Sequence, residues 1–279
     1  MPELPEVEIA ARNLRAWARG RRIDRAEAEA QAKRIFRPGQ PRAFVAALTG
    51  RRVGEVRRVG KHILVRLEDP AGGAEPLGLL SHLGMTGKWL RRSGVEAAPS
   101  HSRARLHLDD GSTLHYRDPR LFGRLRLVPG ARFEDVPEVA GLGPDPLEEG
   151  IDVDRLAAAL ARRKIAVKVA MLDQALLPGV GNILASEALF RARIDPRRSA
   201  SSLSRAEVKR LAGAVLASVA ETIAREEGPE VTYVEEGASE NPFLVYAREG
   251  ERCPRCRREV IRRVVQGQRS TFFCPRCQG

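Results

Sequence analysis

Residues 253–277 read CPRCRREVIRRVVQGQRSTFFCPRC and hold all 4 cysteines of a 279-residue chain. The cysteines form two Cys-X-X-Cys pairs that are separated by 17 residues. Each pair can turn two thiolates toward one point, and two pairs complete the tetrahedral set that Zn²⁺ prefers. A redox Cys-X-X-Cys motif is the alternative, but it has no use for a second copy at this spacing. We therefore predict one structural zinc ion, whose ligands are Cys253, Cys256, Cys274 and Cys277.

The segment between the two pairs has the composition of a two-stranded ribbon. Residues 260–265 and 270–273 can form its strands. Arginines are frequent around them, and such a density of guanidinium groups favours contact with phosphates. The whole chain carries 48 Lys+Arg against 36 Asp+Glu, a formal charge of +12. This balance favours a polyanionic partner, most commonly nucleic acid, but it does not separate DNA from RNA or from a membrane surface.

The N-terminal half combines a helix with a run of short strands. Apolar residues recur at helical spacing over residues 5–19. Apolar and polar residues then alternate in short segments over residues 53–127, where Asp109-Asp110-Gly111 is typical of a hairpin turn. Several strands without intervening helices indicate an antiparallel sandwich or barrel.

The C-terminal half is helical up to the ribbon. Helical patterns occur at residues 153–163, 166–175, 182–192 and 204–226, whereas residues 228–246 have no period and predict a loop. We predict an α+β protein of four parts. They are an N-terminal antiparallel β-sandwich with flanking helices (1–128), a proline- and glycine-rich linker (129–150), a helical domain (151–246) and the zinc ribbon (247–279).

Two glycines directly precede the third of these helices. Gly179 and Gly181 allow the backbone to approach a ligand closely, and the exposed amides of a helix N-terminus attract phosphate oxygens. Such turns more often simply join two helices. The prediction of a phosphate site here therefore depends on the basic charge of the chain and on the zinc ribbon. The chain has no apolar run of membrane-spanning length and no secretory signal at its start, so we expect a cytoplasmic protein with no membrane partner.

Several motifs along the chain resemble those of the bacterial formamidopyrimidine-DNA glycosylase and endonuclease VIII family. They are MPELPEVE at 1–8, HLGMTG at 82–87, DPRLFG at 118–123, the segment 178–190 and QRSTFFC at 268–274. The resemblance implies a β-sandwich followed by a helix-two-turn-helix domain and the zinc ribbon. It also implies a monomeric, nucleoid-associated repair enzyme that acts on double-stranded DNA with oxidised bases or abasic sites.

The resemblance further implies an active site at the start of the chain. After removal of Met1, the secondary amine of Pro2 would attack the sugar C1′, expel the damaged base and leave an iminium ion. Glu3 would be the acid/base at the sugar ring oxygen, although an acidic residue at a helix start is also favoured by the helix dipole. Glu6 would support the amine electrostatically or serve the helix alone. Lys61 and Arg269 would act at phosphates in β- and δ-elimination.

Other positions match residues that contact DNA in this family. Met85, Arg120 and Phe122 would fill the gap left by the extruded base, with Arg120 hydrogen-bonded to the orphaned cytosine. Met85 and Phe122 could equally be core residues, but their turn-rich segments favour exposed loop tips. The residues that resemble backbone contacts are His101, Lys164, Lys168 and Asn182.

Three functions remain open from the sequence. Leu4, where the endonuclease VIII branch has glycine, favours a bifunctional glycosylase and lyase for oxidised purines such as 8-oxoguanine and formamidopyrimidines. Residues 228–250 depart from the loop usual in 8-oxoguanine enzymes, so an oxidised-pyrimidine glycosylase is the second hypothesis. The third is a non-catalytic zinc-ribbon protein that binds damaged DNA, which would need neither Pro2 nor Glu3.

Overall fold

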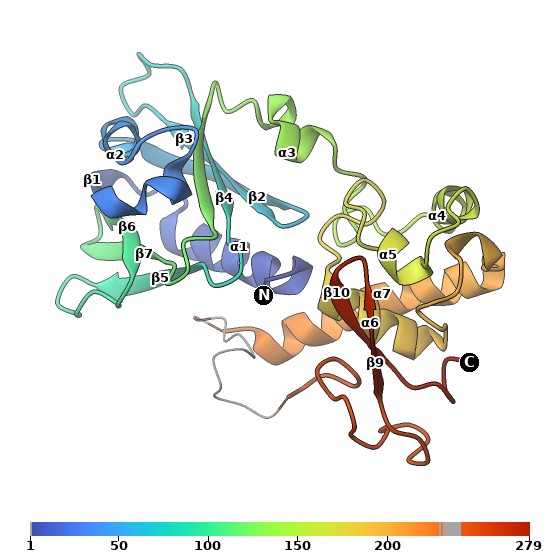
Figure 1. Cartoon of the computed structure of the whole chain (residues 1–279). Helices are drawn as coiled ribbons and strands as arrows, with labels where there is room; N and C mark the ends of the chain where they lie inside the picture. Colours follow the sequence, from blue (N-terminus) through green and yellow to red (C-terminus); the bar gives the residue numbers. More distant parts are fainter. Residues whose placement is uncertain (1, 229, 231–240) are drawn as a thin grey trace. The chain divides into compact units, whose positions relative to one another are not determined.

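The computed structural model describes residues 2–228, 230 and 241–279 (Figure 1). The chain divides into two compact units. Unit 1 comprises Met1–Ala140 with Glu226–Glu235, and unit 2 comprises Gly141–Arg225 with Glu236–Gly279. Most of the predicted loop at 228–246 lies outside the described residues, and the part at 241–246 contains no helix or strand. The predicted domain limits therefore stay predictions.

Unit 1 contains two four-stranded antiparallel sheets, which confirms the predicted sandwich architecture. One sheet has the order β2 (Arg52–Val59), β3 (His62–Glu68), β4 (Leu77–His82) and β8 (Arg124–Pro129). The other has the order β1 (Ile23–Ala28), β6 (Ser102–Leu108), β7 (Ser112–Arg117) and β5 (Lys88–Ser93). The hairpin predicted at Asp109-Asp110-Gly111 joins β6 to β7, with Gly111 at φ +80°.

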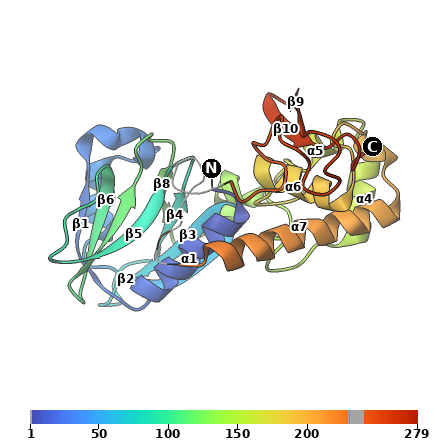
Figure 2. The same cartoon turned by 90° about the horizontal axis from the view of Figure 1, so that it is seen from below.

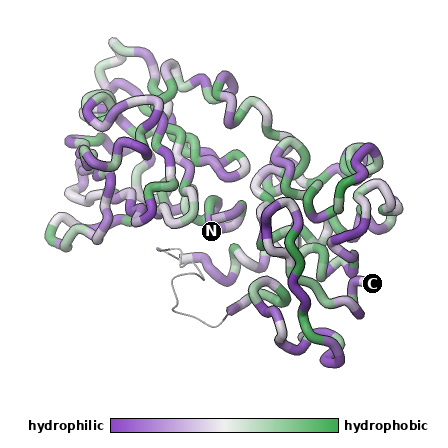
Figure 3. Tube along the Cα trace, viewed as in Figure 1, coloured by the Kyte–Doolittle hydropathy of each residue, from purple (hydrophilic) through white to green (hydrophobic). Residues whose placement is uncertain are grey.

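Helix α1 (Leu4–Ala18) contributes apolar residues to the core of unit 1, and its bounds match the prediction to within one residue. Pro5 occupies the first turn, where its missing N–H leaves no intrahelical bond unmade. The same core contains buried side chains from both sheets, among them Ile63 and Tyr116. Figure 3 shows the short hydrophobic segments that supply such cores. Sequence reasoning assigned no element to residues 20–52, which form β1, η1 (Ala30–Phe36) and α2 (Pro41–Leu48).

Two further short helices follow β8 in unit 1. They are η2 (Phe133–Asp135) and α3 (Pro137–Ala140), and both fall in the stretch predicted to be a linker. Val136, between them, packs with Leu64 and Leu80 on the sheet that contains β3 and β4. This stretch therefore has regular structure and core contacts where its composition alone predicts irregular chain.

Apart from the ribbon at its end, unit 2 is built from helices (Figure 2). They are α4 (Val153–Ala161), α5 (Val167–Ala170), α6 (Asn182–Ala192), η3 (Ala200–Ser202) and α7, whose bounds are Arg205–Glu226. The prediction of a helix over 166–175 was too long. Asp173 accepts a hydrogen bond from the Ala175 N–H at 3.0 Å, a side-chain turn that competes with helix continuation. No helix within the described ranges is long and apolar enough to cross a membrane.

The ribbon at the end of unit 2 has the two predicted strands, β9 (Arg262–Gln266) and β10 (Arg269–Phe273). It packs on α6 through a small apolar cluster. That cluster contains Phe190, Val245, Ile261, Phe272 and two of the cysteines. The short ribbon is thus held by a helix on one side and by its thiol groups within.

Candidate functional site

The chain enters α1 through a buried and hydrogen-bonded turn. Pro2 is buried, and Glu3 is 1% exposed at the residue preceding the helix. The Glu6 Oε2 atom accepts a hydrogen bond from the Glu3 N–H at 2.8 Å, which forms part of a capping box. Proline, a carboxyl group and a second carboxyl group are therefore fixed together at one helix start.

The Glu6 carboxyl is protonated more readily than an ordinary glutamate. Burial, followed by the charges of Glu226 and Glu3, raises the pKa of Glu6 from 4.5 to about 7. A carboxyl with this pKa can hold or release a proton near neutral pH, which is the property required for acid/base chemistry. From the sequence, a structural and a functional role for Glu6 were equally well supported. The hydrogen bond to the Glu3 N–H shows that Glu6 caps the helix. Its raised pKa is also compatible with electrostatic support of the Pro2 amine.

Lys61 lies in the tight turn between β2 and β3. Gly60 adopts φ +56° in this turn, a conformation that favours glycine. The buried Arg58 donates from Nη1 to the Gly60 carbonyl at 3.2 Å. Lys61 is half-buried, so the hairpin presents it at a defined place in the same unit as Pro2 and Glu3.

Met85 and Phe122 lie in two loops of unit 1 and do not belong to its core. Phe122 is 40% exposed, Arg120 is exposed and Met85 is half-buried. The guanidinium carbons of Arg120 and Arg34 lie 4.9 and 5.1 Å from the Phe122 ring centroid. These are cation–π distances. Arg34, in η1, was missed by sequence reasoning because a lone arginine in a basic segment carries no signal of such a contact.

The predicted backbone-contact residues differ in exposure. His101 is exposed at φ +60°, and its carbonyl accepts the Asp118 N–H at 3.0 Å. Lys164 is also exposed. Lys168, in contrast, is completely buried in α5. His101, Lys164 and Lys168 therefore stay predictions, with Lys168 the least exposed of the three.

The glycine turn before α6 is fixed by a glutamine. Gln174 donates from Nε2 to the Val180 carbonyl at 2.9 Å, and its Oε1 accepts the Gly179 N–H at 3.0 Å. Gly179 adopts φ +84°, which a side chain would strain. Gly181 precedes Asn182, the first helical residue, as the sequence predicts. The turn is thus a rigid feature of unit 2.

Asn182 connects that turn to the zinc ribbon. Its Nδ2 donates to the Ser270 carbonyl at 2.8 Å, and the residue is 6% exposed. Ser270 follows Arg269 on β10, directly after a turn in which Gly267 and Gln268 both have positive φ. Two such residues make the tight turn usual in hairpins. Arg269 is exposed beside it.

The four cysteines fit a tetrahedral zinc ion. Their sulfur atoms all lie within 4.8 Å of one another, and the pairs Cys253–Cys277 and Cys256–Cys274 are both 3.8 Å apart. Tetrahedral ligands at the usual Zn–S distance of about 2.3 Å lie about 3.8 Å apart. This spacing is far beyond a disulfide bond of about 2.05 Å. The chain thus holds one structural zinc site, as predicted.

The pKa values of the thiols reflect how closely the four sulfur atoms lie to one another. Backbone hydrogen bonds from Glu259 and Arg258 lower the pKa of Cys256 to about 6. Burial, reinforced by the neighbouring thiols, raises the pKa of Cys277 to about 12. Four thiolates this close repel one another, and a divalent ion removes that repulsion.

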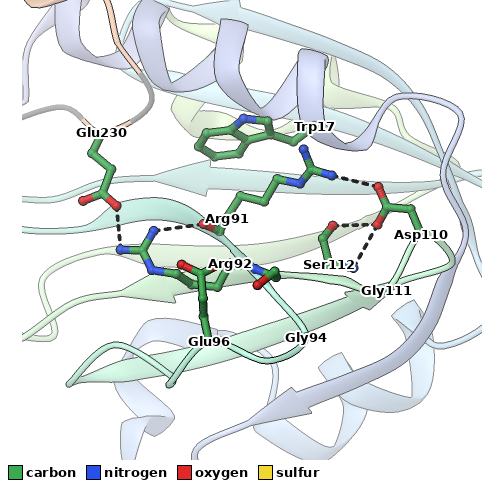
Figure 4. A pocket seen from close by; sticks show the side chains of 10 residues that line it. Trp17, Arg91, Arg92, Gly94, Glu96, Asp110, Gly111, Ser112 and Glu230 are labelled. Carbon is green, nitrogen blue, oxygen red and sulfur yellow. Dashed lines mark hydrogen bonds and ion pairs between the residues drawn. The ribbon is translucent and has the colours of Figure 1, made fainter.

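A pocket of about 490 Å³ lies elsewhere in unit 1 (Figure 4). Trp17 on α1, Arg91 and Arg92 on β5 and the Asp110 hairpin line it. Arg91 is paired with Asp110 at 2.9 Å, and Arg92 with Glu230 at 2.5 Å. The pocket contains none of the predicted site residues, and both of its arginines are already neutralised.

Comparison with known families matches almost the whole chain. Residues 1–125 match the formamidopyrimidine-DNA glycosylase N-terminal domain, 142–232 its H2TH domain, and 250–279 a zinc finger found in such glycosylases and in IleRS. The β-sandwich, helical domain and zinc ribbon together define a DNA glycosylase of the helix-two-turn-helix class. More particularly, the chain belongs to the formamidopyrimidine-DNA glycosylase family.

The similarity to individual relatives covers the full length of this chain or nearly so. The formamidopyrimidine-DNA glycosylases of Paracoccus denitrificans and Acidiphilium cryptum are 42% and 40% identical, with 100% of both chains covered in each case. The crystal structure of MutM (Fpg) from Thermus thermophilus is 38% identical with a TM-score of 0.80, covering 100% of this chain and 99% of that one. Lactococcus lactis Fpg in complex with DNA containing an abasic site is 26% identical with a TM-score of 0.84, covering 99% of each chain.

Proposed function

We propose that this chain excises oxidised purines from double-stranded DNA and then cleaves the strand at the abasic site. The observation that carries the proposal is the buried start of α1, where Pro2 adjoins Glu3 and a Glu6 carboxyl with a pKa of about 7. A protein that only binds damaged DNA gains nothing from such a group beside an N-terminal proline. Family membership and the relatives' structures with damaged DNA support the same assignment.

The first step joins the protein to the sugar. After removal of Met1, the lone pair of the neutral Pro2 nitrogen attacks C1′, and the glycosidic bond breaks with its electron pair going to the base. The proton that the Pro2 nitrogen then loses balances the one that the departing base takes up. Glu3 protonates the ring oxygen O4′ as the C1′–O4′ bond opens, which leaves an iminium ion between Pro2 and C1′. A secondary amine has no second proton to lose at this stage, so the iminium carries a fixed positive charge.

That charge drives strand cleavage. It acidifies the C2′ proton, whose removal expels the 3′-phosphate, and a second elimination expels the 5′-phosphate. Lys61 is proposed to act at the lesion phosphate in the first elimination, and Arg269 at the phosphates in the second. Both are presented by tight hairpin turns, which supports a role in holding a phosphate at a fixed place.

The damaged base must leave the stack before this chemistry. Met85, Arg120 and Phe122 are proposed to fill the gap, with Arg120 hydrogen-bonded to the orphaned cytosine. His101, Lys164, Lys168 and Asn182 are proposed contacts of the sugar-phosphate backbone. Asn182 is mostly buried and donates a hydrogen bond to the Ser270 carbonyl, so we propose that it also holds the ribbon against α6. We further propose that the protein acts on the chromosome in the bacterial cytoplasm, as a monomer.

Substrate preference separates this proposal from its alternative. The test is single-turnover cleavage of three duplexes, which contain 8-oxoguanine, formamidopyrimidine or 5-hydroxycytosine, each with and without borohydride. We expect covalent trapping on all cleaved substrates and faster excision of the two purine lesions. Faster excision of 5-hydroxycytosine would favour the oxidised-pyrimidine enzyme, and a Lactococcus lactis Fpg structure with an oxidised pyrimidine makes that comparison pertinent. Binding without cleavage or trapping would leave only a damage-binding protein.

A further inference from the structure

One buried carboxylate links the two loops that hold Met85 and Phe122. Asp118 is 0% exposed, and its Oδ1 accepts a hydrogen bond from the Thr86 hydroxyl at 2.7 Å. The same oxygen accepts the Arg120 N–H at 3.2 Å, and Oδ2 accepts the Gly123 N–H at 2.8 Å. Thr86 follows Met85 directly, and the other two donors flank Phe122. Asp118 therefore joins one loop to both sides of the other.

The chain also packs closely around two glycines of these loops. A Cβ on Gly84 would collide with the backbone of Phe122, and a Cβ on Gly123 would collide with the Tyr116 hydroxyl. Tyr116 is itself buried and donates to the His82 carbonyl at 3.0 Å, immediately before the Met85 loop. Glycine at position 84 therefore lets the Met85 loop contact the backbone of Phe122, and glycine at position 123 lets the Phe122 loop contact Tyr116. These contacts add to the hydrogen bonds of Asp118.

We infer that Asp118 is a positioning residue, which presets Met85, Arg120 and Phe122 as a single rigid wedge before DNA is bound. The inference rests on the proposed function, because it assigns a role to those three side chains. Rigid presentation matters since each must enter the base stack or meet the orphaned base at the moment when the lesion leaves. Loops that had to order at that moment would lose conformational entropy and slow base extrusion.

The Thr86 hydroxyl provides the sharpest test of this link. Thr86→Val keeps the size of the side chain but removes the hydroxyl that bonds the Met85 loop to Asp118. Thr86→Ser keeps the hydroxyl and should restore the bond. Asp118→Asn is a second variant, because its NH₂ group must face either the Gly123 N–H or the donors on Oδ1. A donor facing a donor cannot bond, so this change loosens both loops.

A matched control lies in the same unit. Ser112 donates from Oγ to Asp110 Oδ1 at 2.6 Å, also a hydroxyl-to-carboxylate bond, in the hairpin beside the pocket of Figure 4. Ser112→Ala removes this bond without touching either wedge loop. It should leave excision and opposite-base preference unchanged.

The experiment compares two substrates in the full-length zinc-bound protein. One is a duplex with 8-oxoguanine opposite cytosine or adenine, measured as single-turnover excision. The other is a single-stranded oligonucleotide with an abasic site, which has no orphaned base and no stack to fill. We expect Thr86→Val and Asp118→Asn to slow duplex excision about tenfold or more. They should also reduce the preference for cytosine over adenine while leaving single-strand cleavage intact.

The outcomes separate three cases. Loss of duplex excision and of cytosine preference, with rescue by Thr86→Ser and intact single-strand cleavage, supports a preset wedge. An unchanged cytosine-to-adenine ratio, or an equal loss on both substrates with a lower unfolding midpoint, would overturn it, because Asp118 would then only stabilise the fold. If wild-type protein neither excises nor cleaves, the proposed function itself fails and the inference fails with it.

Discussion

Arg58 donates a hydrogen bond from Nε to Glu8 Oε2 at 2.7 Å, in an ion pair whose two side chains are 0% and 7% exposed. Burial alone would raise the pKa of Glu8, but hydrogen bonds from Arg58 and Arg12 outweigh it and lower that pKa. Glu8 lies on α1, and Arg58 lies on β2 just before the turn with Lys61. The pair therefore fixes the helix that begins beside Pro2 against the hairpin that presents Lys61.

Removing Arg58 should cost far more stability than removing the other partner of Glu8. Arg58→Met leaves a buried carboxylate with one partially exposed arginine, and we expect it to lower the free energy of unfolding by about 3 kcal/mol. Arg12 is 42% exposed, so Arg12→Met should cost less than about 1 kcal/mol. Urea denaturation of both variants measures the difference. Equal losses would show that burial does not set the strength of this pair.

Glu6 should make the stability of the protein depend on pH. Because its pKa in the fold is raised from 4.5 to about 7, its contribution is fully present below pH 4.5 and is lost as the pH rises through 7. Glu6→Gln keeps an oxygen that can accept the Glu3 N–H but cannot ionise. Between pH 4.5 and 8, wild type should therefore lose about 3 kcal/mol of stability relative to this variant. Parallel stability curves for the two proteins would argue against a raised pKa.

Loss of one zinc ligand should unfold the ribbon and weaken DNA binding. Cys274→Ala leaves three thiols, which cannot close the tetrahedral site, so we expect zinc content to fall from one ion per chain toward zero. Metal analysis by mass spectrometry and DNA titration measure the two effects. Val265→Ser is the control, since Val265 is 67% exposed on the same ribbon. A Cys274→Ala protein that keeps both its metal and its affinity would contradict the site.

Arg269 should affect the final product more than the first cleavage. Arg269→Gln removes an exposed guanidinium, so the fold should tolerate the change. We expect β-elimination to persist while the product of the second elimination decreases about tenfold or more. Gel analysis of the two strand ends distinguishes the products. A proportional fall in both would indicate that Arg269 serves DNA binding in general.

The sequence predicted the parts of this protein that depend on local patterns. The zinc ligands follow from cysteine spacing, and α6 begins at Asn182 because glycine precedes it. Residues 20–52 escaped prediction because their helix and strand are short and depend on packing against the sheets. The burial of Lys168 could not be anticipated either, since a lysine in an amphipathic segment is ordinarily solvated.

The hydrogen bonds that hold the site residues in place could not be predicted from local sequence patterns either. Asp118 contacts Thr86, which lies 32 residues earlier, and Arg58 contacts Glu8, which lies 50 residues earlier. Hydrogen bonds between such distant residues are set by sheet register and helix packing. Motif reasoning identified Met85, Arg120 and Phe122 by resemblance, but only the fold shows what holds their loops together.

The most direct test of the chemistry is to locate the covalent bond. Purified protein would be checked by mass spectrometry for removal of Met1, reacted with an 8-oxoguanine duplex under borohydride, digested and mapped. We predict a reduced sugar adduct on the Pro2 nitrogen, and loss of most trapping in Pro2→Gly. An adduct on a lysine, or undiminished trapping in Pro2→Gly, would contradict the account.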